Sequence, residues 1–260
     1  MYSTPQEGRG FGNYLYYWLR AQLEQSHGKD YKVLHAPGME PWLAELPAVR
    51  NRLVVTLGEL RFSDRRIASE DTWVDRFGMD FTREDLHTFV DRYVVGSPLL
   101  GEARTGSEVL VINVRRGDFY SVPAFRGTYG FDIQGYMELA LPRALAAGGP
   151  VESIQVVSDG VEWCEIKLDG LLRRHAREVR YLPPTDSPQD NFRVVANAAR
   201  IIGTNSTFTY WAGYVSNVVH GANSHVVMPD FHARHIDHGR AYQLDPDWEI
   251  VRDIPGGWDA

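Results

Sequence analysis

The sequence predicts an α/β fold built on a parallel sheet, and three observations support this prediction. Residues 109–112 form an apolar, mostly β-branched run that leads directly into the polar segment 113–118, as a buried strand does where it leaves a sheet. Strand-like and helix-like segments then alternate, which is typical of parallel strands joined by helices. Residues 96–107 are rich in Gly, Ser, Pro and charge, so we place a domain boundary near residue 105.

The predicted first domain, residues 1–105, begins with a glycine-containing turn. Residues 14–25 carry apolar side chains at three- and four-residue spacing, which predicts a helix that ends near Gly28. Glycines before a helix let a ligand approach backbone N–H groups, although this spacing is not a dinucleotide fingerprint and we expect no strand before it. The remaining pattern predicts strands over 31–34 and 53–57 and a helix over 84–93.

The predicted second domain, residues 106–260, contains the regular alternation. Apolar runs predict strands over 109–114, 153–158, 179–182, 200–203 and 225–228. Helices are predicted over 136–147, 162–176 and 189–199, with another starting at 206. Residues 119–131 are expected to form a loop, whose aromatic side chains either stack on an acceptor sugar or fold back onto the core.

The composition excludes several classes of protein. A net charge of -7 and a pI near 5.7 argue against a nucleic-acid-binding protein, whose affinity depends on a basic surface. The one cysteine, Cys164, allows no internal disulfide and fits a reducing compartment. The amino terminus lacks a secretory pattern, and the uncharged run 201–229 is too polar for a membrane span. We therefore expect a cytoplasmic protein and leave open a loose association with the inner face of the membrane.

Polar side chains follow three predicted strands on one expected edge of the sheet. Arg115, Arg116 and Asp118 follow the first strand, Asp159 follows the second, and the hydroxyl-bearing segment 204–207 follows a third. Ligands of open parallel sheets bind at this edge. Guanidinium groups match diphosphates, and helix starts attract phosphate.

Each of these signals also has an ordinary explanation. Paired arginines after a strand are often solvated surface, and Ser206 or Thr207 would be a sound helix cap. Considered together, however, the arginines and the helix start predict a pyrophosphate site in which protein charge, without a metal, stabilises a leaving diphosphate.

Four segments, in the same order, resemble the α-1,2-fucosyltransferases and their relatives, the α-1,6- and protein O-fucosyltransferases. The amino-terminal G-G-L-G-N-Q segment of the family is matched by Gly8, Gly10, Gly12 and Asn13, and the H-x-R-R-x-D motif is matched by residues 113–118. The S-D-D-x-x-W segment is matched by Ser158, Asp159 and Trp163. The acidic helix and the N-S-(S/T)-F-S-W-W segment are matched by Asp190 and residues 205–211. Four ordered matches are far more specific than any one of them.

This resemblance implies two Rossmann-like domains that face a cleft (GT-B-like), the first of them reduced. Residues 1–105 would form the acceptor side, and residues 106–260 would bind the nucleotide sugar. The implied reaction is an inverting, metal-independent transfer of fucose from GDP-fucose to a hydroxyl of a glycan acceptor, without a cofactor. It also implies that the partners are this nucleotide-sugar donor and the glycan acceptor.

The resemblance also implies roles for individual residues. Arg116, with Arg115 as a second candidate, would hold the β-phosphate at the catalytic centre, where Asp118 is expected to shape the arginine loop. Asp159 would read guanine. The implied donor-binding residues are Gly10, Gly12, Asn13, Asn113, Asp159, Asn205, Ser206, Thr207 and Phe208.

The chain departs from the family pattern at three positions. Asn113 stands where the motif has His, Gly160 replaces the second Asp of S-D-D, and Tyr210 replaces the first aromatic residue of W-W. Asparagine can hydrogen-bond but does not titrate near neutral pH. Three alternatives therefore stay open: a non-catalytic nucleotide-sugar-binding protein, a transferase that uses another GDP-sugar, and another α/β enzyme of phosphorylated substrates.

Two further questions concern titratable residues. Glu7, Asp118 and Asp132 are candidates by position for the general base that an inverting transfer requires. Residues 230–238 contain three histidines and two aspartates, but their spacing fits no zinc motif, so we expect no metal there.

Overall fold

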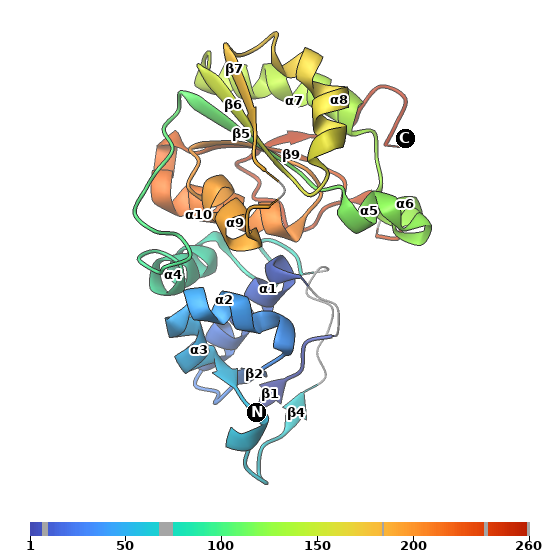
Figure 1. Cartoon of the computed structure of the whole chain (residues 1–260). Helices are drawn as coiled ribbons and strands as arrows, with labels where there is room; N and C mark the ends of the chain where they lie inside the picture. Colours follow the sequence, from blue (N-terminus) through green and yellow to red (C-terminus); the bar gives the residue numbers. More distant parts are fainter. Residues whose placement is uncertain (7–9, 68–74, 184, 237–238, 259–260) are drawn as a thin grey trace. The chain divides into compact units, whose positions relative to one another are not determined.

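The structure, a computed structural model, describes residues 1–6, 10–67, 75–183, 185–236 and 239–258. The chain divides into two compact units, Met1–Glu102 and Ala103–Ala260. The division lies close to the boundary that the composition of residues 96–107 suggested. Each unit contains its own parallel sheet, so the α/β class predicted from the sequence is confirmed (Figure 1).

The first unit is built on a four-stranded parallel sheet in the order β3-β2-β1-β4. Its strands are β1 (Tyr2–Ser3), β2 (Lys32–Leu34), β3 (Val54–Val55) and β4 (Arg66–Ile67). Its helices are α1 (Phe11–Ser26), α2 (Glu40–Glu45), α3 (Pro47–Leu53) and α4 (Arg83–Tyr93), with short 3-10 turns η1 (Pro37–Met39) and η2 (Leu57–Glu59).

Two expectations for the first unit were wrong. A strand, β1, does precede the glycine-containing turn, but two residues are too few to produce a readable pattern. The strand expected over 53–57 is reduced to β3, because Leu53 ends α3 and a capping box between Thr56 and Glu59 starts η2. The predicted helix over 84–93 corresponds to α4, whose cap at Thr82 accepts a hydrogen bond from the Asp85 backbone.

Helix α1 forms the centre of the first unit. Ten of its 16 residues are buried, and the Phe11 ring stacks on Trp42 of α2 with ring centroids 3.6 Å apart. The helix ends at Ser26, and Gly28 follows with a φ of 79°, a left-handed backbone conformation that glycine adopts without a steric penalty.

The second unit is built on a six-stranded parallel sheet in the order β10-β9-β8-β5-β6-β7. Its strands are β5 (Val109–Val114), β6 (Ser153–Ser158), β7 (Glu178–Tyr181), β8 (Arg200–Gly203), β9 (His225–Pro229) and β10 (Glu249–Val251). Its helices are α5 (Gly117–Ser121), α6 (Pro123–Tyr129), α7 (Ile133–Gly148), α8 (Val161–Leu172), α9 (Pro188–Ala196) and α10 (Thr207–His220), with a 3-10 turn η4 (Gly221–Asn223).

Strand β5 occupies the point where the strand order reverses. From β5 the chain proceeds outward through β6 and β7, and then returns to place β8 on the other side of β5, followed by β9 and β10. In open parallel sheets, ligands bind outside the carboxyl ends of the strands at this switch point. The topology therefore directs attention to the residues that follow β5 and β8.

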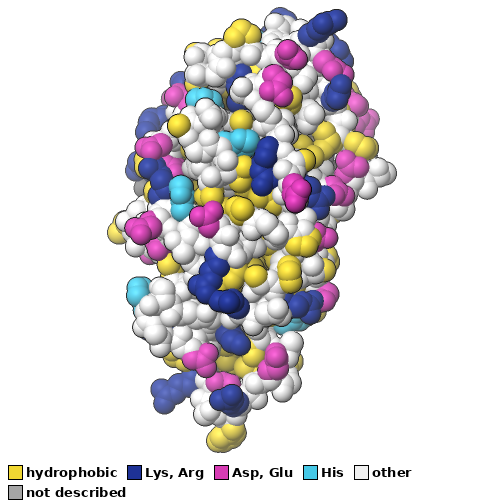
Figure 2. All heavy atoms as spheres, turned by 90° about the vertical axis from the view of Figure 1, so that its left-hand side faces the viewer, with side chains coloured by type: hydrophobic (Ala, Val, Ile, Leu, Met, Phe, Trp, Pro, Cys, Tyr) yellow, Lys and Arg dark blue, Asp and Glu magenta, His cyan; other side chains and the backbone are white. Residues whose placement is uncertain are grey.

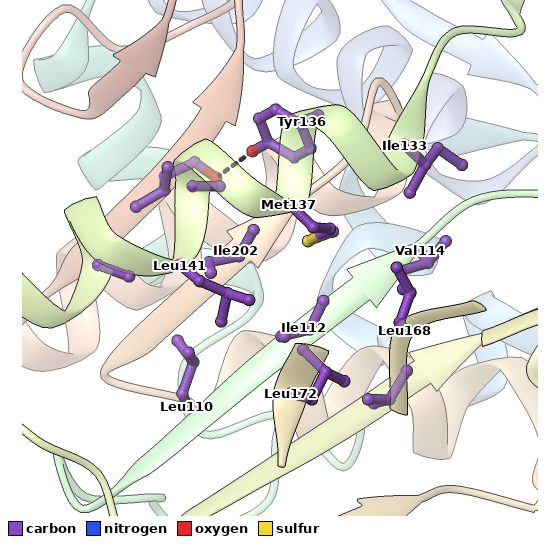
Figure 3. Packing of buried hydrophobic residues seen from close by; sticks show 14 of the residues in the cluster. Leu110, Ile112, Val114, Ile133, Tyr136, Met137, Leu141, Leu168, Leu172 and Ile202 are labelled. Atoms are coloured by element: carbon purple, nitrogen blue, oxygen red, sulfur yellow. Dashed lines mark hydrogen bonds between the residues drawn. The ribbon is translucent and has the colours of Figure 1, made fainter. Parts of the chain in front are cut away.

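Side chains of β5 alternate between the two faces of the sheet. Leu110, Ile112 and Val114 join the main hydrophobic cluster with α7 and α8, including Met137 and Leu168 (Figure 3). All five of these side chains are completely buried. Helices α9 and α10 pack against each other and against β5 and β8, respectively. Both faces of β5 are covered, which explains its continuous apolar sequence.

The segment 119–131, which we expected to be a loop, is mostly helical. It contains the end of α5 and all of α6, so that expectation was wrong. Pro123 lies in the first turn of α6, where its missing N–H has no helical partner, so it begins this helix rather than breaking it. Strand β10 was not predicted. It follows Trp248, which stacks on Tyr214 of α10 with ring centroids 5.2 Å apart.

No helix among the described residues is long and apolar enough to cross a membrane.

Candidate functional site

Three chain segments meet at the carboxyl edge of the second sheet. The backbone N–H of Arg115, after β5, donates to Thr204 Oγ1, after β8, at 2.8 Å. The N–H of Arg116 donates to Asp159 Oδ1, after β6, at 2.6 Å. The structure thus brings together the three polar strand ends that the sequence placed on one edge.

The two adjacent arginines have different surroundings. The Arg115 guanidinium donates to Asp159 Oδ2 and to Asp118 Oδ1, both at 2.5 Å. Its charge is therefore compensated by two carboxylates, which also fix the loop after β5 to the loop after β6. Asp118 contacts Arg115 as expected of a residue that shapes the loop, while the catalytic assignments of both residues stay predictions. Both carboxylate oxygens of Asp159 are already bonded within these loops. The expected contact of Asp159 with guanine also stays a prediction.

Arg116 has no such compensation. Its guanidinium carbon lies 4.0 Å from the ring centroid of Tyr120 and 4.0 Å from that of Trp163, so the group is held between two aromatic faces. No carboxylate of the described residues lies within ion-pair distance of it. Desolvation by burial lowers the pKa of Arg116, which still stays charged at neutral pH. Arg116 is thus a positioned cation whose N–H groups are available to an anion.

Two glycines allow these loops to approach each other. A Cβ on Gly117 would lie 2.5 Å from Asp159 Oδ2, and a Cβ on Gly160 would lie 2.9 Å from Arg116 Cβ. Both distances are shorter than real Cβ contacts, so a side chain at Gly160 would displace Arg116 at its Cβ, while one at Gly117 would shift the end of the Asp159 side chain. Gly160 is the position at which the family motif has Asp.

We expect Gly160→Asp to displace Arg116 and to weaken GDP binding by about tenfold or more, because overpacking of this kind costs roughly 1–3 kcal/mol. Folding should be retained, since residue 160 is the N-cap of α8 and Asp is a favourable N-cap residue. Calorimetric titration with GDP is the measurement. Gly170→Asp, in the same helix with open space at its Cβ, is the matched control. Equal GDP affinity of Gly160→Asp and the parent would contradict the placement of Arg116.

The start of α10 provides further donors at the same edge. Ser206 occupies the N-cap position and is largely buried, but its side chain makes no capping hydrogen bond. Thr207 begins the helix, and the ring of Phe208 packs edge-on against Phe192 at 5.2 Å. The backbone amides of a first helical turn carry a partial positive charge that favours a phosphate.

Two asparagines in the candidate set lie in the interior. Asn113 is 6% exposed; its Nδ2 donates to the Val157 carbonyl at 3.1 Å, and its Oδ1 accepts from Thr209 Oγ1 at 2.5 Å. Asn205 is completely buried and donates to the carbonyls of Tyr129 and His232, both at 2.8 Å. In this structure both side chains hold the polypeptide in place, and their contact with a donor stays a prediction.

The remaining candidates belong to other elements of the chain. Gly10, Gly12 and Asn13 lie at the start of α1 in the first unit, where the Asn13 N–H donates to the Gly10 carbonyl at 3.0 Å. Asp132 caps α7 through the Gly135 N–H, also at 3.0 Å. Of the other positions considered, Glu7, Gly8, Asp237 and His238 lie outside the described residues.

The histidine-rich stretch contributes a buried neutral imidazole. His232 Nδ1 is 3.0 Å from the Tyr210 hydroxyl, and desolvation by burial lowers the pKa of His232 to about 4. Within the described part of the chain, no group of three His, Cys, Asp or Glu side chains could hold a metal ion.

Protonation of His232 should couple folding to pH. The unfolded chain takes up this proton near pH 6.5 and the folded chain only near pH 4, so stability is lost as the pH falls through this interval. We expect a loss of about 2–3 kcal/mol between pH 7.5 and 4.5 from this group alone. The check is urea unfolding at both pH values for the parent and for His232→Gln. The difference between the two pH values should be smaller in the variant by this amount, and equal differences would refute the assignment.

Sequence reasoning missed the partners of Arg116. Trp163 was identified only as part of a motif, and Tyr120 only as one of several loop aromatics. A helical reading of the segment after Arg116 would have indicated Tyr120, because residues four apart lie on one face of a helix.

Sequence comparison identifies the family. The model of Glycosyl transferase family 11 matches residues 78–243, and a search of curated proteins finds no match. Among solved structures, the heptosyltransferase WaaC from E. coli with ADP has a TM-score of 0.44 at 12% identity over 99% of this chain and 95% of its own. The dodecameric iron-containing heptosyltransferase TibC in complex with ADP-D-beta-D-heptose has a TM-score of 0.45 at 11% identity over 99% of this chain and 63% of its own. Similarity at this level does not bear on the donor or the acceptor.

The family match covers well over half of the sequence and includes the arginine loop, the loop after β6 and the start of α10. The chain is therefore a glycosyltransferase and belongs to Glycosyl transferase family 11, the family of the α-1,2-fucosyltransferases.

Proposed function

We propose that this glycosyltransferase moves fucose from GDP-fucose to a hydroxyl group of a glycan, with inversion at the anomeric carbon and without a metal ion. The observation that carries the proposal is the uncompensated guanidinium of Arg116, held between Tyr120 and Trp163 at the switch point of a parallel sheet. Family membership supports the choice of fucose and of a guanosine diphosphate leaving group.

The reaction requires stabilisation of a leaving diphosphate. The acceptor oxygen attacks the anomeric carbon of fucose, the bond from that carbon to the β-phosphate oxygen breaks, and its electron pair leaves with GDP. The acceptor proton passes to a base or to water. Arg116 would donate two N–H groups to the β-phosphate as negative charge develops there. The first turn of α10 would bind the phosphates from another side.

The arrangement around Arg116 suits this role. The carboxylates of Asp118 and Asp159 both accept hydrogen bonds from the Arg115 guanidinium, so neither forms an ion pair with Arg116. The aromatic rings restrict its motion and reduce its hydration, both of which strengthen an interaction with a phosphate.

The test is a comparison of nucleotide sugars in the presence of EDTA. We expect GDP to bind more tightly than UDP or ADP, and GDP-fucose to be hydrolysed or transferred while GDP-mannose is not. Loss of activity on chelation would refute metal independence. A preference for GDP-mannose would support a transferase of another GDP-sugar.

The buried state of Asn113 favours one alternative. Its position in the motif carries no titratable group here, and both ends of its amide have partners inside the protein. If activity depends on an ionisable group at this position, the chain binds nucleotide sugars without turning them over. Tight binding of GDP-fucose with no release of GDP in the presence of any glycan would favour this alternative.

A further inference from the structure

A segment of the first unit, residues 57–67, exposes large apolar side chains to solvent; we refer to it as the Phe62 loop. The relative exposure of Phe62 is 110% and that of Leu57 is 76%. An aromatic side chain without any packing partner gives no stability to the folded state, and exposed apolar groups of this size commonly mark a contact surface.

Three arginines lie in the same loop. Arg61, Arg65 and Arg66 are exposed, and none of them has an ion pair with a carboxylate of the described residues. The two carboxylates of the loop are used on its own backbone. Asp64 accepts from the Arg61 N–H at 2.7 Å, and Glu59 accepts from the Thr56 N–H at 2.8 Å. The guanidinium groups are consequently available to external anions.

The loop is held at both ends. The capping box of Thr56 and Glu59 fixes its start, and β4 pairs with β1 at its end, where the Tyr2 N–H donates to the Arg65 carbonyl at 3.0 Å. The loop forms the lower end of the first unit in Figure 1, and the same end of Figure 2 shows a projecting hydrophobic side chain with basic side chains beside it. Its shape is therefore set by the fold before any contact is made.

We propose that the Phe62 loop binds the surface of an anionic lipid bilayer. Phe62 and Leu57 would enter the region between the headgroups, where aromatic and aliphatic side chains are favoured, and the arginines would contact lipid phosphates. An exposed aromatic tip beside three arginines without ion pairs presents the apolar and phosphate-binding groups that the headgroup region of an anionic bilayer accommodates together. A second copy of this chain, with its net charge of -7, would also attract the arginines, and the test below separates it from lipid. The inference goes beyond glycosyl transfer and does not depend on it.

The test is sedimentation of the full chain with vesicles, without nucleotide. We expect binding to vesicles of equal parts phosphatidylcholine and phosphatidylglycerol, and much weaker binding to phosphatidylcholine alone. Phe62→Ser should weaken binding about tenfold. Arg61→Ala, Arg65→Ala and Arg66→Ala should each weaken it by a factor of about five at low salt. The corresponding Lys variants should bind as the parent does, since the contact depends on charge.

All of these side chains are exposed, so the variants should fold. Ile166→Ser, which removes a 69% exposed side chain from α8 in the other unit, is the matched control and should bind as the parent does. Failure of the parent to bind phosphatidylglycerol vesicles, or unchanged binding of Phe62→Ser, would overturn the proposal. A lipid-free dimer in sedimentation velocity that Phe62→Ser abolishes would also overturn it, because the loop would then be an interface between copies. GDP binding of these variants should be unchanged.

Discussion

Arg116→Ala should lower kcat for transfer from GDP-fucose by about 100- to 1,000-fold, the range found when one donor to a developing negative charge is removed. The physical reason is that no carboxylate of the described residues lies within ion-pair distance of the Arg116 guanidinium, so its N–H groups are available to the leaving diphosphate. GDP binding should weaken at the same time, by about tenfold or more, because a charge-assisted hydrogen bond contributes roughly 1.5–3 kcal/mol. Steady-state transfer assays and calorimetry with GDP are the measurements.

The surrounding residues make this prediction specific. Arg116→Lys keeps the charge but loses the planar fork that stacks between Tyr120 and Trp163, so we expect intermediate activity. Arg180→Ala is the matched control, because Arg180 is an exposed arginine of β7 that pairs with Glu178 and belongs to none of the loops that form the candidate site. If Arg116→Ala bound GDP as well as Arg180→Ala does, the site would have to be placed elsewhere.

The longer strands could be predicted from the sequence, and the shortest strands could not. The predicted bounds of β5, β6 and β8 agree with the structure because strands covered on both faces need continuous apolar runs. β1 and β4 have two residues each and β10 has three, which is shorter than the smallest pattern that alternation can reveal. Their pairing is determined by neighbouring strands that are distant in sequence.

The position of the candidate site could be predicted from the sequence, but the separate roles of its two arginines could not. The sequence placed Arg115 and Arg116 at one strand end, but nothing local distinguishes adjacent arginines. The distinction comes from Asp159 and Trp163, which follow a different strand: the Asp159 carboxylate pairs with the guanidinium of Arg115, and the Trp163 ring lies against the guanidinium of Arg116. The capping contacts and the helical state of α5 could not be anticipated for the same reason: each depends on a partner brought by the fold.

A third arginine, Arg200, shows how far such partners decide a residue's function. It is the first residue of β8 and is completely buried, yet no carboxylate of the described residues pairs with it. Instead it donates to the carbonyls of Ser107, Ala144 and Gly149 at 3.1, 2.7 and 2.8 Å. Two of these carbonyls belong to the end of α7, where helical carbonyls lack partners and the helix dipole is negative.

Arg200→Met should therefore destabilise the second unit by about 2–4 kcal/mol, since one buried carbonyl and two partly buried ones lose their donor while the apolar volume is largely kept. Hydrogen exchange of the β5 and β8 amides reports this unit alone, without assuming that both units unfold together. Arg143→Met is the matched control. Its exposed pairing with Glu249 should contribute less than about 1 kcal/mol. Equal protection in the two variants would mean that water replaces the guanidinium at the carbonyls, and that the end of α7 does not depend on a buried charge.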